Sequence, residues 1–137
     1  MIDTGKKNLI AGIVAMLLAM FGGLALAFTF DAFAVRGNDH VLSLVRFYLR
    51  EGHSHGMPLA IFNMLIALWV DRVELSRTLK QVVSWSAICS LILPLALAMK
   101  GAAGAPSDFP PLGLPGVLGL ALALSLMLAG AIRMKRG

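Results

Sequence analysis

The chain has 137 residues, of which 58% are hydrophobic and 14% are charged. An average soluble domain is about 45–50% apolar and about 25% charged, so this composition indicates a membrane protein and leaves no room for a separate soluble catalytic module. The net charge is +5, but the Lys and Arg residues lie at the edges of apolar stretches, which excludes a nucleic-acid-binding patch.

The first apolar stretch, at about residues 9–30, contains no charged residue. Its length is enough to cross a hydrocarbon core of about 30 Å. The pattern is similar to that of a secretory signal peptide, with Lys6 and Lys7 before the apolar stretch and an Ala25-Leu26-Ala27 triplet near its end. The apolar region exceeds the about 7–15 residues of such signals, so we expect an uncleaved transmembrane helix.

A polar interval follows, with an amphipathic pattern inside it. Asp39, Ser43, Arg46 and Arg50 recur at helical spacing, while apolar side chains share the opposite side. This pattern predicts a short interfacial helix at about residues 40–51, which either caps the bundle or binds lipid or a partner.

The second predicted span, at about residues 55–72, is built on an apolar run of only 14 residues, Met57 to Val70. To cross the membrane, the helix must also include residues on either side of this run, so His53 and His55 should lie at the membrane surface. Pro58 is favourable in a first helical turn, so we expect both histidines in a turn that precedes the helix.

Two further spans are predicted at about residues 81–99 and 112–132, separated by a loop rich in Gly, Ala and Pro. Pro94 should kink the third span. The sequence therefore predicts a single all-α membrane domain over residues 1–137, with four transmembrane helices in a bundle plus a short interfacial amphipathic helix. No charged residue lies within the apolar part of a span, which argues against ion translocation by this chain alone.

The distribution of positive charge predicts the orientation in the membrane. Because cytoplasmic loops carry an excess of Lys and Arg, both termini should be cytoplasmic in an integral protein of a bacterial inner membrane. The eight cationic residues of the predicted cytoplasmic side are Lys6, Lys7, Arg72, Arg77, Lys80, Arg133, Lys135 and Arg136, against Arg36, Arg46, Arg50 and Lys100 on the outer side.

Potential metal ligands gather in one place, where Glu51, His53 and His55 follow His40 by a short segment. Imidazole binds Zn, Cu, Ni and haem iron, and a carboxylate can complete such a site. In an extended turn, His53 and His55 would project to the same side. In a continuous helix they would diverge by about 200°, and Glu51 and His55 would be the facing pair.

The alternative to a ligand role is a structural one. In that interpretation the histidines cap the helix and hydrogen-bond interfacial waters, loop carbonyls or Asp108. The single cysteine, Cys89, excludes an internal disulfide and a thiolate cluster.

Residues 50–56, Arg-Glu-Gly-His-Ser-His-Gly, run into a helix that contains Leu59, Asn63 and Leu65. This segment resembles the His-x-His helix start of haem-copper oxidase and nitric oxide reductase catalytic subunits, in which a histidine ligates a haem. The resemblance covers about 15 residues and implies His53 and His55 as cofactor-binding residues. An opposing ligand would come from His40, a methionine or a partner chain.

Two hypotheses on function remain, and neither is enzymatic, because the sequence contains no catalytic triad order, phosphate loop or paired carboxylates within a span. The first is a haem- or copper-associated electron-transfer, accessory or assembly protein with an outer-face site formed by His53, His55, Glu51 and His40. The second is a cofactor-free structural accessory subunit of a larger membrane complex. The expected partners are the lipid bilayer and either further copies of the chain or that complex.

Overall fold

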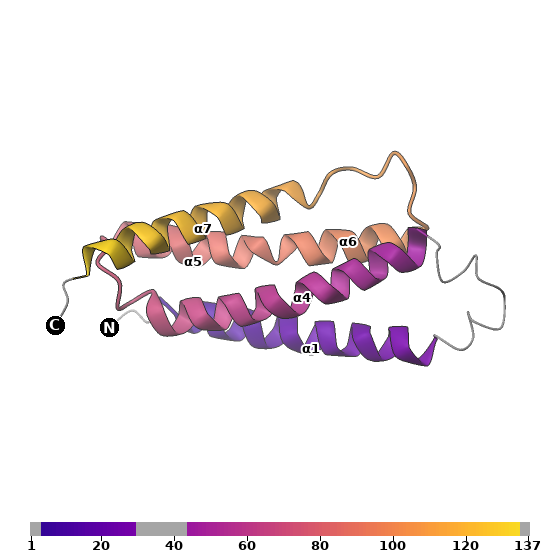
Figure 1. Ribbon diagram of the computed structural model, residues 1–137, viewed down its shortest axis with the longest axis horizontal. Coiled ribbons are helices and arrows are strands. Elements are labelled where there is room, and N and C mark those ends of the chain that lie inside the picture. The colour runs from indigo at the N-terminus through magenta and orange to yellow at the C-terminus, as the bar shows by residue number, and fades with distance from the viewer. Residues whose placement is uncertain (1–3, 30–43, 135–137) are drawn as a thin grey trace.

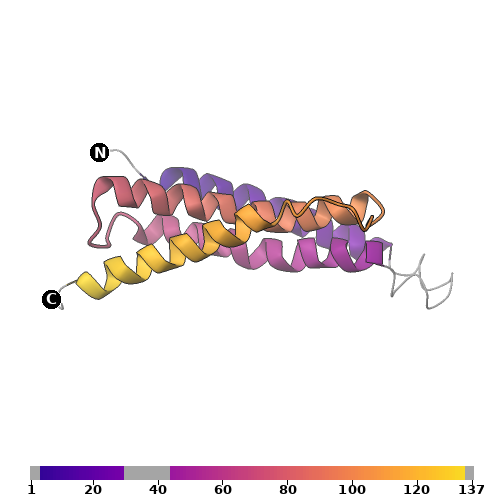
Figure 2. The same cartoon turned by 90° about the horizontal axis from the view of Figure 1, so that it is seen from above.

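The computed structural model describes residues 4–29 and 44–134, and every regular element within them is a helix (Figure 1). All of these helices run along the long axis of the molecule in both views (Figures 1 and 2). The elements are α1 (Lys6–Phe28), α4 (Leu44–Trp69), α5 (Arg77–Ser90), α6 (Ile92–Ala102) and α7 (Leu114–Arg133).

Within the described residues, three helical segments are long and apolar enough to cross a membrane: Lys6–Phe28, Arg77–Ala102 and Leu114–Arg133. Their outward side chains are apolar, as at Leu18 of α1 and Leu118 of α7, which are 66% and 69% exposed. Such a surface is typical of a helical membrane protein. The helix α4 has 26 residues but carries charged side chains in its first half, so a fourth span remains a prediction.

The helix α4 joins two elements that the sequence analysis had separated. Residues 44–51, from the predicted interfacial helix, continue without a break through His53 and His55 into the predicted second span. The expected turn before Pro58 is therefore wrong, because Pro58 lies inside the helix. Proline removes one backbone hydrogen bond, here to the Ser54 carbonyl, and packing against neighbouring helices offsets that loss. Residues 40–43 lie outside the described residues.

Small residues bring the helices together. A Cβ atom at Gly12 of α1 would lie 2.8 Å from the Ala60 carbonyl oxygen of α4, and one at Gly52 of α4 would lie 2.9 Å from Cβ of Ala98 in α6. Such close backbone approach is a common basis of helix association in lipid. The same holds for α7, where Gly116 lies against Leu93. The apolar core consists of Ile66, Val70, Val83, Ala87 and Ala123.

Pro94 interrupts the third span, as predicted. The helix α5 ends at Ser90, and α6 begins at Ile92. Pro94 has no N–H to donate to the Ser90 carbonyl, so the regular hydrogen-bond pattern cannot continue through this point.

The helices are staggered along the bundle. Gly56 of α4 lies against both Ala19, in the second half of α1, and Pro94 of α6. Gly116, at the beginning of α7, lies against Leu93. The beginning of α7 is therefore level with Ala19, and α1 and α6 extend past it (Figure 1). The start of α1 and the end of α7 lie at the same end of the bundle (Figure 1).

Candidate functional site on helix α4

The polar half of α4 lies alongside apolar parts of two other helices. His53 reaches the Ala19 carbonyl of α1, and the Arg46 Nη2 atom donates to the Leu26 carbonyl at 3.0 Å. On the other side, Gly101 of α6 lies against Leu49. The sequence analysis had placed His53 at the membrane surface and Arg46 in a short interfacial helix. The contacts instead bring them level with the apolar second half of α1.

His53 lies in the contact between α1 and α4. Its Nδ1 atom is 2.7 Å from the Ala19 carbonyl oxygen. A carbonyl only accepts hydrogen bonds, so Nδ1 carries the proton and donates. The ring occupies the space left by Gly23, where a Cβ atom would lie 2.5 Å from the His53 Cε1 atom. In the neutral ring, Nε2 then keeps its lone pair.

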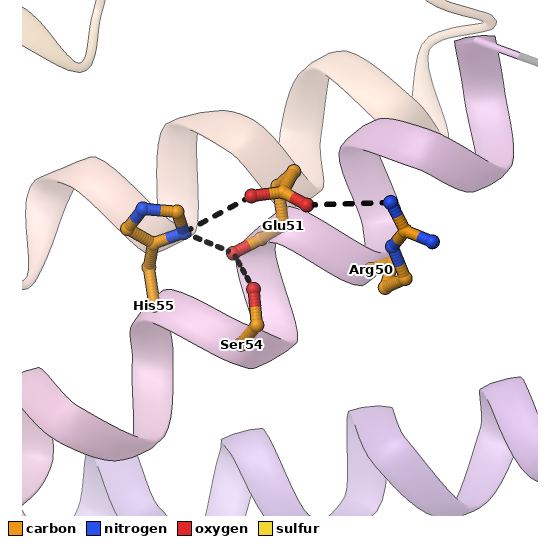
Figure 3. A network of polar contacts seen from close by, with 4 residues as sticks. All are labelled: Arg50, Glu51, Ser54 and His55. Carbon is orange, nitrogen blue, oxygen red and sulfur yellow. Dashed lines mark hydrogen bonds and ion pairs between the residues drawn. The ribbon is translucent and has the colours of Figure 1, made fainter.

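His55 is exposed and contacts Glu51 of its own helix (Figure 3). Its side chain is 46% exposed, and its Nδ1 atom donates to the Glu51 carbonyl oxygen at 2.9 Å. The Glu51 carboxylate oxygen Oε2 is 3.5 Å from the same nitrogen, and its Oε1 is 3.7 Å from Arg50 Nη2. Ser54 also donates to the Glu51 carbonyl, at 3.3 Å. Glu51 is thus the centre of the polar contacts in Figure 3.

The two histidines do not converge on one point. The continuous helix separates them by two residues, about 200° of rotation, and only the Glu51–His55 pair shares a side. This was the outcome expected for a helical segment. Within residues 4–29 and 44–134, no three His, Cys, Asp or Glu side chains are close enough to hold a metal ion. His40 lies outside the described residues, so the predicted four-ligand set stays a prediction.

The side of α4 opposite its helix contacts carries a regular row of exposed residues. Phe47, Ser54, Ile61 and Leu68 are all exposed and follow one another at intervals of seven. We call these four residues the exposed α4 face. Phe47 is 43%, Ile61 48% and Leu68 59% exposed, whereas Leu59 and Ala60, between them in sequence, are buried.

A second polar cluster, at the other end of the bundle, joins three helices. Asn8 Nδ2 donates to Asn63 Oδ1 at 3.1 Å and to the Ser84 carbonyl at 3.0 Å. Asn63 Nδ2 donates to the Leu59 and Ala87 carbonyls at 3.0 and 2.8 Å. The sequence analysis did not identify Asn8, which lies just before the first predicted span, as part of such a cluster. Every polar group of Asn63 is engaged, so this cluster has a structural role.

Comparison with known proteins returned no matching family model, no matching curated protein and no matching solved structure. The resemblance of residues 50–56 to haem-copper oxidases therefore stays a prediction. A proposal on function therefore rests on the side chains of α4 and on their contacts.

Proposed function

We propose that this chain is a small integral membrane subunit that packs against another membrane protein through the exposed α4 face. The observation that supports this is that Arg50 and Glu51 flank the exposed α4 face in the part of α4 that lies alongside apolar α1 and α6. Charged side chains at the bilayer centre cost about 2.5–3.5 kcal/mol each on insertion scales and normally face protein. A partner helix would cover them and supply hydrogen bonds.

In this proposal both termini face the cytoplasm of a bacterial inner membrane. Among the described residues, more cationic side chains lie at the end of the bundle that holds the termini than at the other end. The positive-inside rule assigns the more cationic end to the cytoplasm. At the same end, Lys7 Nζ lies 4.0 Å from the Trp85 ring centre and Arg72 Cζ lies 5.2 Å from that of Trp69. Such pairs of tryptophan and cation are typical of a membrane interface.

Site-specific photo-cross-linking in native membranes tests the packing role. A photoreactive amino acid at Ser54 should give a discrete protein adduct. The matched control is Leu18 on the outer side of α1, 66% exposed and surrounded by apolar residues, where we expect lipid adducts only. Lipid adducts alone at Ser54, in cells that express the protein at native level, would contradict the proposal.

A second candidate function is the binding of haem or copper, and the direction of the imidazoles favours it. Metal-binding histidines usually donate the second ring N–H to a carbonyl or carboxylate, and both His53 and His55 do so through Nδ1. Each ring therefore has an Nε2 lone pair of the kind that a metal takes. Because the rings diverge, each fits a single-ligand role, and further ligands would come from His40 or a partner. Haem or copper would supply one-electron redox chemistry.

The optical spectrum and the metal content of the purified protein test this second candidate. A Soret band or stoichiometric copper should be present and should disappear in His53→Ala or in His55→Ala, and the variant that loses it identifies the ligand. A colourless, metal-free protein, purified within its native complex, would exclude cofactor binding.

A further inference from the structure

The exposed α4 face has the period of a helix that packs lengthwise against another helix. Phe47, Ser54, Ile61 and Leu68 recur every seven residues, which is two helical turns at the 3.5-residue period of a left-handed helix pair. The row extends along almost all of α4, from its first turn to its last. One long partner helix could therefore contact it throughout.

Two opposite charges flank this row at one level. Successive residues of a helix are rotated by about 100°, so Arg50 and Glu51 lie about 50° to either side of the line between Phe47 and Ser54. They differ in height by only about 1.5 Å. The exposed α4 face therefore has a positive edge and a negative edge at the same depth.

Two-fold symmetry makes these edges complementary. When two parallel helices are related by a two-fold axis along their length, the left edge of one faces the right edge of the other. Arg50 of each copy would then face Glu51 of its partner, as opposite charges at flanking positions do in parallel coiled coils. All copies inserted by the same topology are parallel, so the membrane itself supplies this orientation.

The contact within one chain leaves both charges available for such pairing. Arg50 Nη2 and Glu51 Oε1 are 3.7 Å apart, and the Arg50 and Glu51 side chains are 66% and 25% exposed. Adjacent helical residues do not face each other, so this pair has poor geometry. Ser54, next to them on the exposed α4 face, is small enough to let two helices approach closely.

We propose that the occupant of the exposed α4 face is a second copy of this chain, in a parallel two-fold dimer with reciprocal Arg50–Glu51 ion pairs. The inference rests on the proposed packing function and names the partner of that surface. The self-complementary arrangement of one cation and one anion about the row of apolar residues selects a second copy over an unrelated helix.

Charge reversal provides a specific test in lipid bicelles, with differently tagged copies and energy transfer as the readout. Arg50→Glu places two acidic residues on the face, and Glu51→Arg places two basic residues there. Each variant alone should lose dimerisation by roughly tenfold or more, because like charges then meet. A mixture of the two variants should form the mixed dimer, and the double variant R50E/E51R should regain the homodimer.

The rescue by mixing also controls for folding, because two misfolded chains would not recover a specific dimer. Arg77→Glu makes the same charge change at the other end of the bundle and should leave dimerisation unchanged. In the unaltered charge background, Ser54→Cys should form a disulfide-linked dimer on oxidation, whereas Leu18→Cys on α1 should not.

The outcomes separate this inference from the function on which it rests. A monomeric wild-type protein whose Ser54 cross-links to a different membrane protein would overturn the dimer and leave the packing function intact. A dimer that persists in both charge variants would overturn the Arg50–Glu51 pairing. A monomer whose Ser54 reaches only lipid would overturn both.

Discussion

Asn63 shows what one polar side chain contributes inside an apolar bundle. It accepts a hydrogen bond from Asn8 and donates to the carbonyls of Leu59 and Ala87, and it is completely buried. Interhelical hydrogen bonds in lipid contribute about 0.6–1.7 kcal/mol each. Asn63 therefore connects α1, α4 and α5 through a single amide group.

Asn63→Leu should lower the free energy of unfolding by about 1–3 kcal/mol, because it removes these bonds and leaves the Asn8 amide with the Ser84 carbonyl as its remaining acceptor. Unfolding in mixed micelles with increasing SDS measures the change. Ser125→Ala is the control: its hydroxyl is exposed and bonds only the Ala121 carbonyl of its own helix, so we expect a change within about 0.5 kcal/mol. Equal effects of the two substitutions would contradict a stabilising role for the Asn63 hydrogen bonds.

The adjacent glycines Gly22 and Gly23 have different surroundings. A Cβ atom at Gly23 would lie 2.5 Å from His53 Cε1, whereas one at Gly22 would meet nothing within 4 Å. Gly23→Ala should therefore destabilise the protein by about 1–2 kcal/mol by displacing the ring. Gly22→Ala should be neutral or stabilising by up to about 1 kcal/mol through helix propensity.

The same micelle unfolding assay compares these two glycine variants. In a His53→Ala background the penalty of Gly23→Ala should shrink, since the ring that it displaces is gone. If Gly23→Ala lowered the free energy of unfolding equally in the presence and absence of the ring, the packing of His53 against Gly23 would be contradicted.

At this scale the sequence predicted which residues are chemically informative but not what they contact. His53 and His55 were identified, and the facing pair of Glu51 and His55 was expected for a helix. The carbonyl that His53 contacts, at Ala19, is 34 residues away in sequence, and no local pattern indicates it.

At the level of elements, α4 is where local signals and tertiary packing disagree. Pro58 led to the prediction of a turn before it, and Gly52, Gly56 and Pro58 are all residues that favour a helix end. In the structure Gly52 lies against α6 and Gly56 against α1, so two of the three are needed for close helix contacts. Such a role is visible only when the neighbouring helices are known. The apolar runs of α1 and α7, by contrast, predicted their helices to within a few residues.

Pro58 should be a weak point of α4. Pro58→Ala restores an N–H that can donate to the Ser54 carbonyl, and it should raise the free energy of unfolding by up to about 3 kcal/mol. The matched control is Pro115→Ala, in the first turn of α7, where no intrahelical acceptor exists and we expect a change within about 0.5 kcal/mol. Unfolding in mixed micelles at low protein concentration measures both, and a destabilising Pro58→Ala would argue that the helix is broken there.

For the whole molecule, hydropathy predicted a helical membrane protein, and the three membrane-length apolar helices of the described residues support this. Hydropathy could not predict which helices are neighbours, because the apolar surfaces of the helices have similar compositions and composition alone does not select a partner. The close contacts at Gly12, Gly52 and Gly116 make that selection. The orientation in the membrane follows from charge and stays a prediction.

Cysteine accessibility tests that orientation. Ser107→Cys, in the exposed loop after α6, should react with a membrane-impermeant maleimide in intact spheroplasts. Thr78→Cys, exposed at the end that holds both termini, should react only after lysis. The wild-type protein, whose single cysteine is the partly buried Cys89, gives the background. The reverse pattern of labelling would place the termini outside.

The stagger between α1 and α7 has a consequence for the surrounding lipid. The beginning of α7 is level with Ala19, so the midpoint of α7 lies about five residues, roughly 8 Å, nearer the termini than the midpoint of α1. These two helices form opposite edges of the molecule (Figure 1). Their apolar belts are thus at different heights, and hydrophobic mismatch follows on one side unless the bundle inclines. The protein should therefore sit tilted in a flat bilayer, with the leaflets thinned or thickened unequally around it.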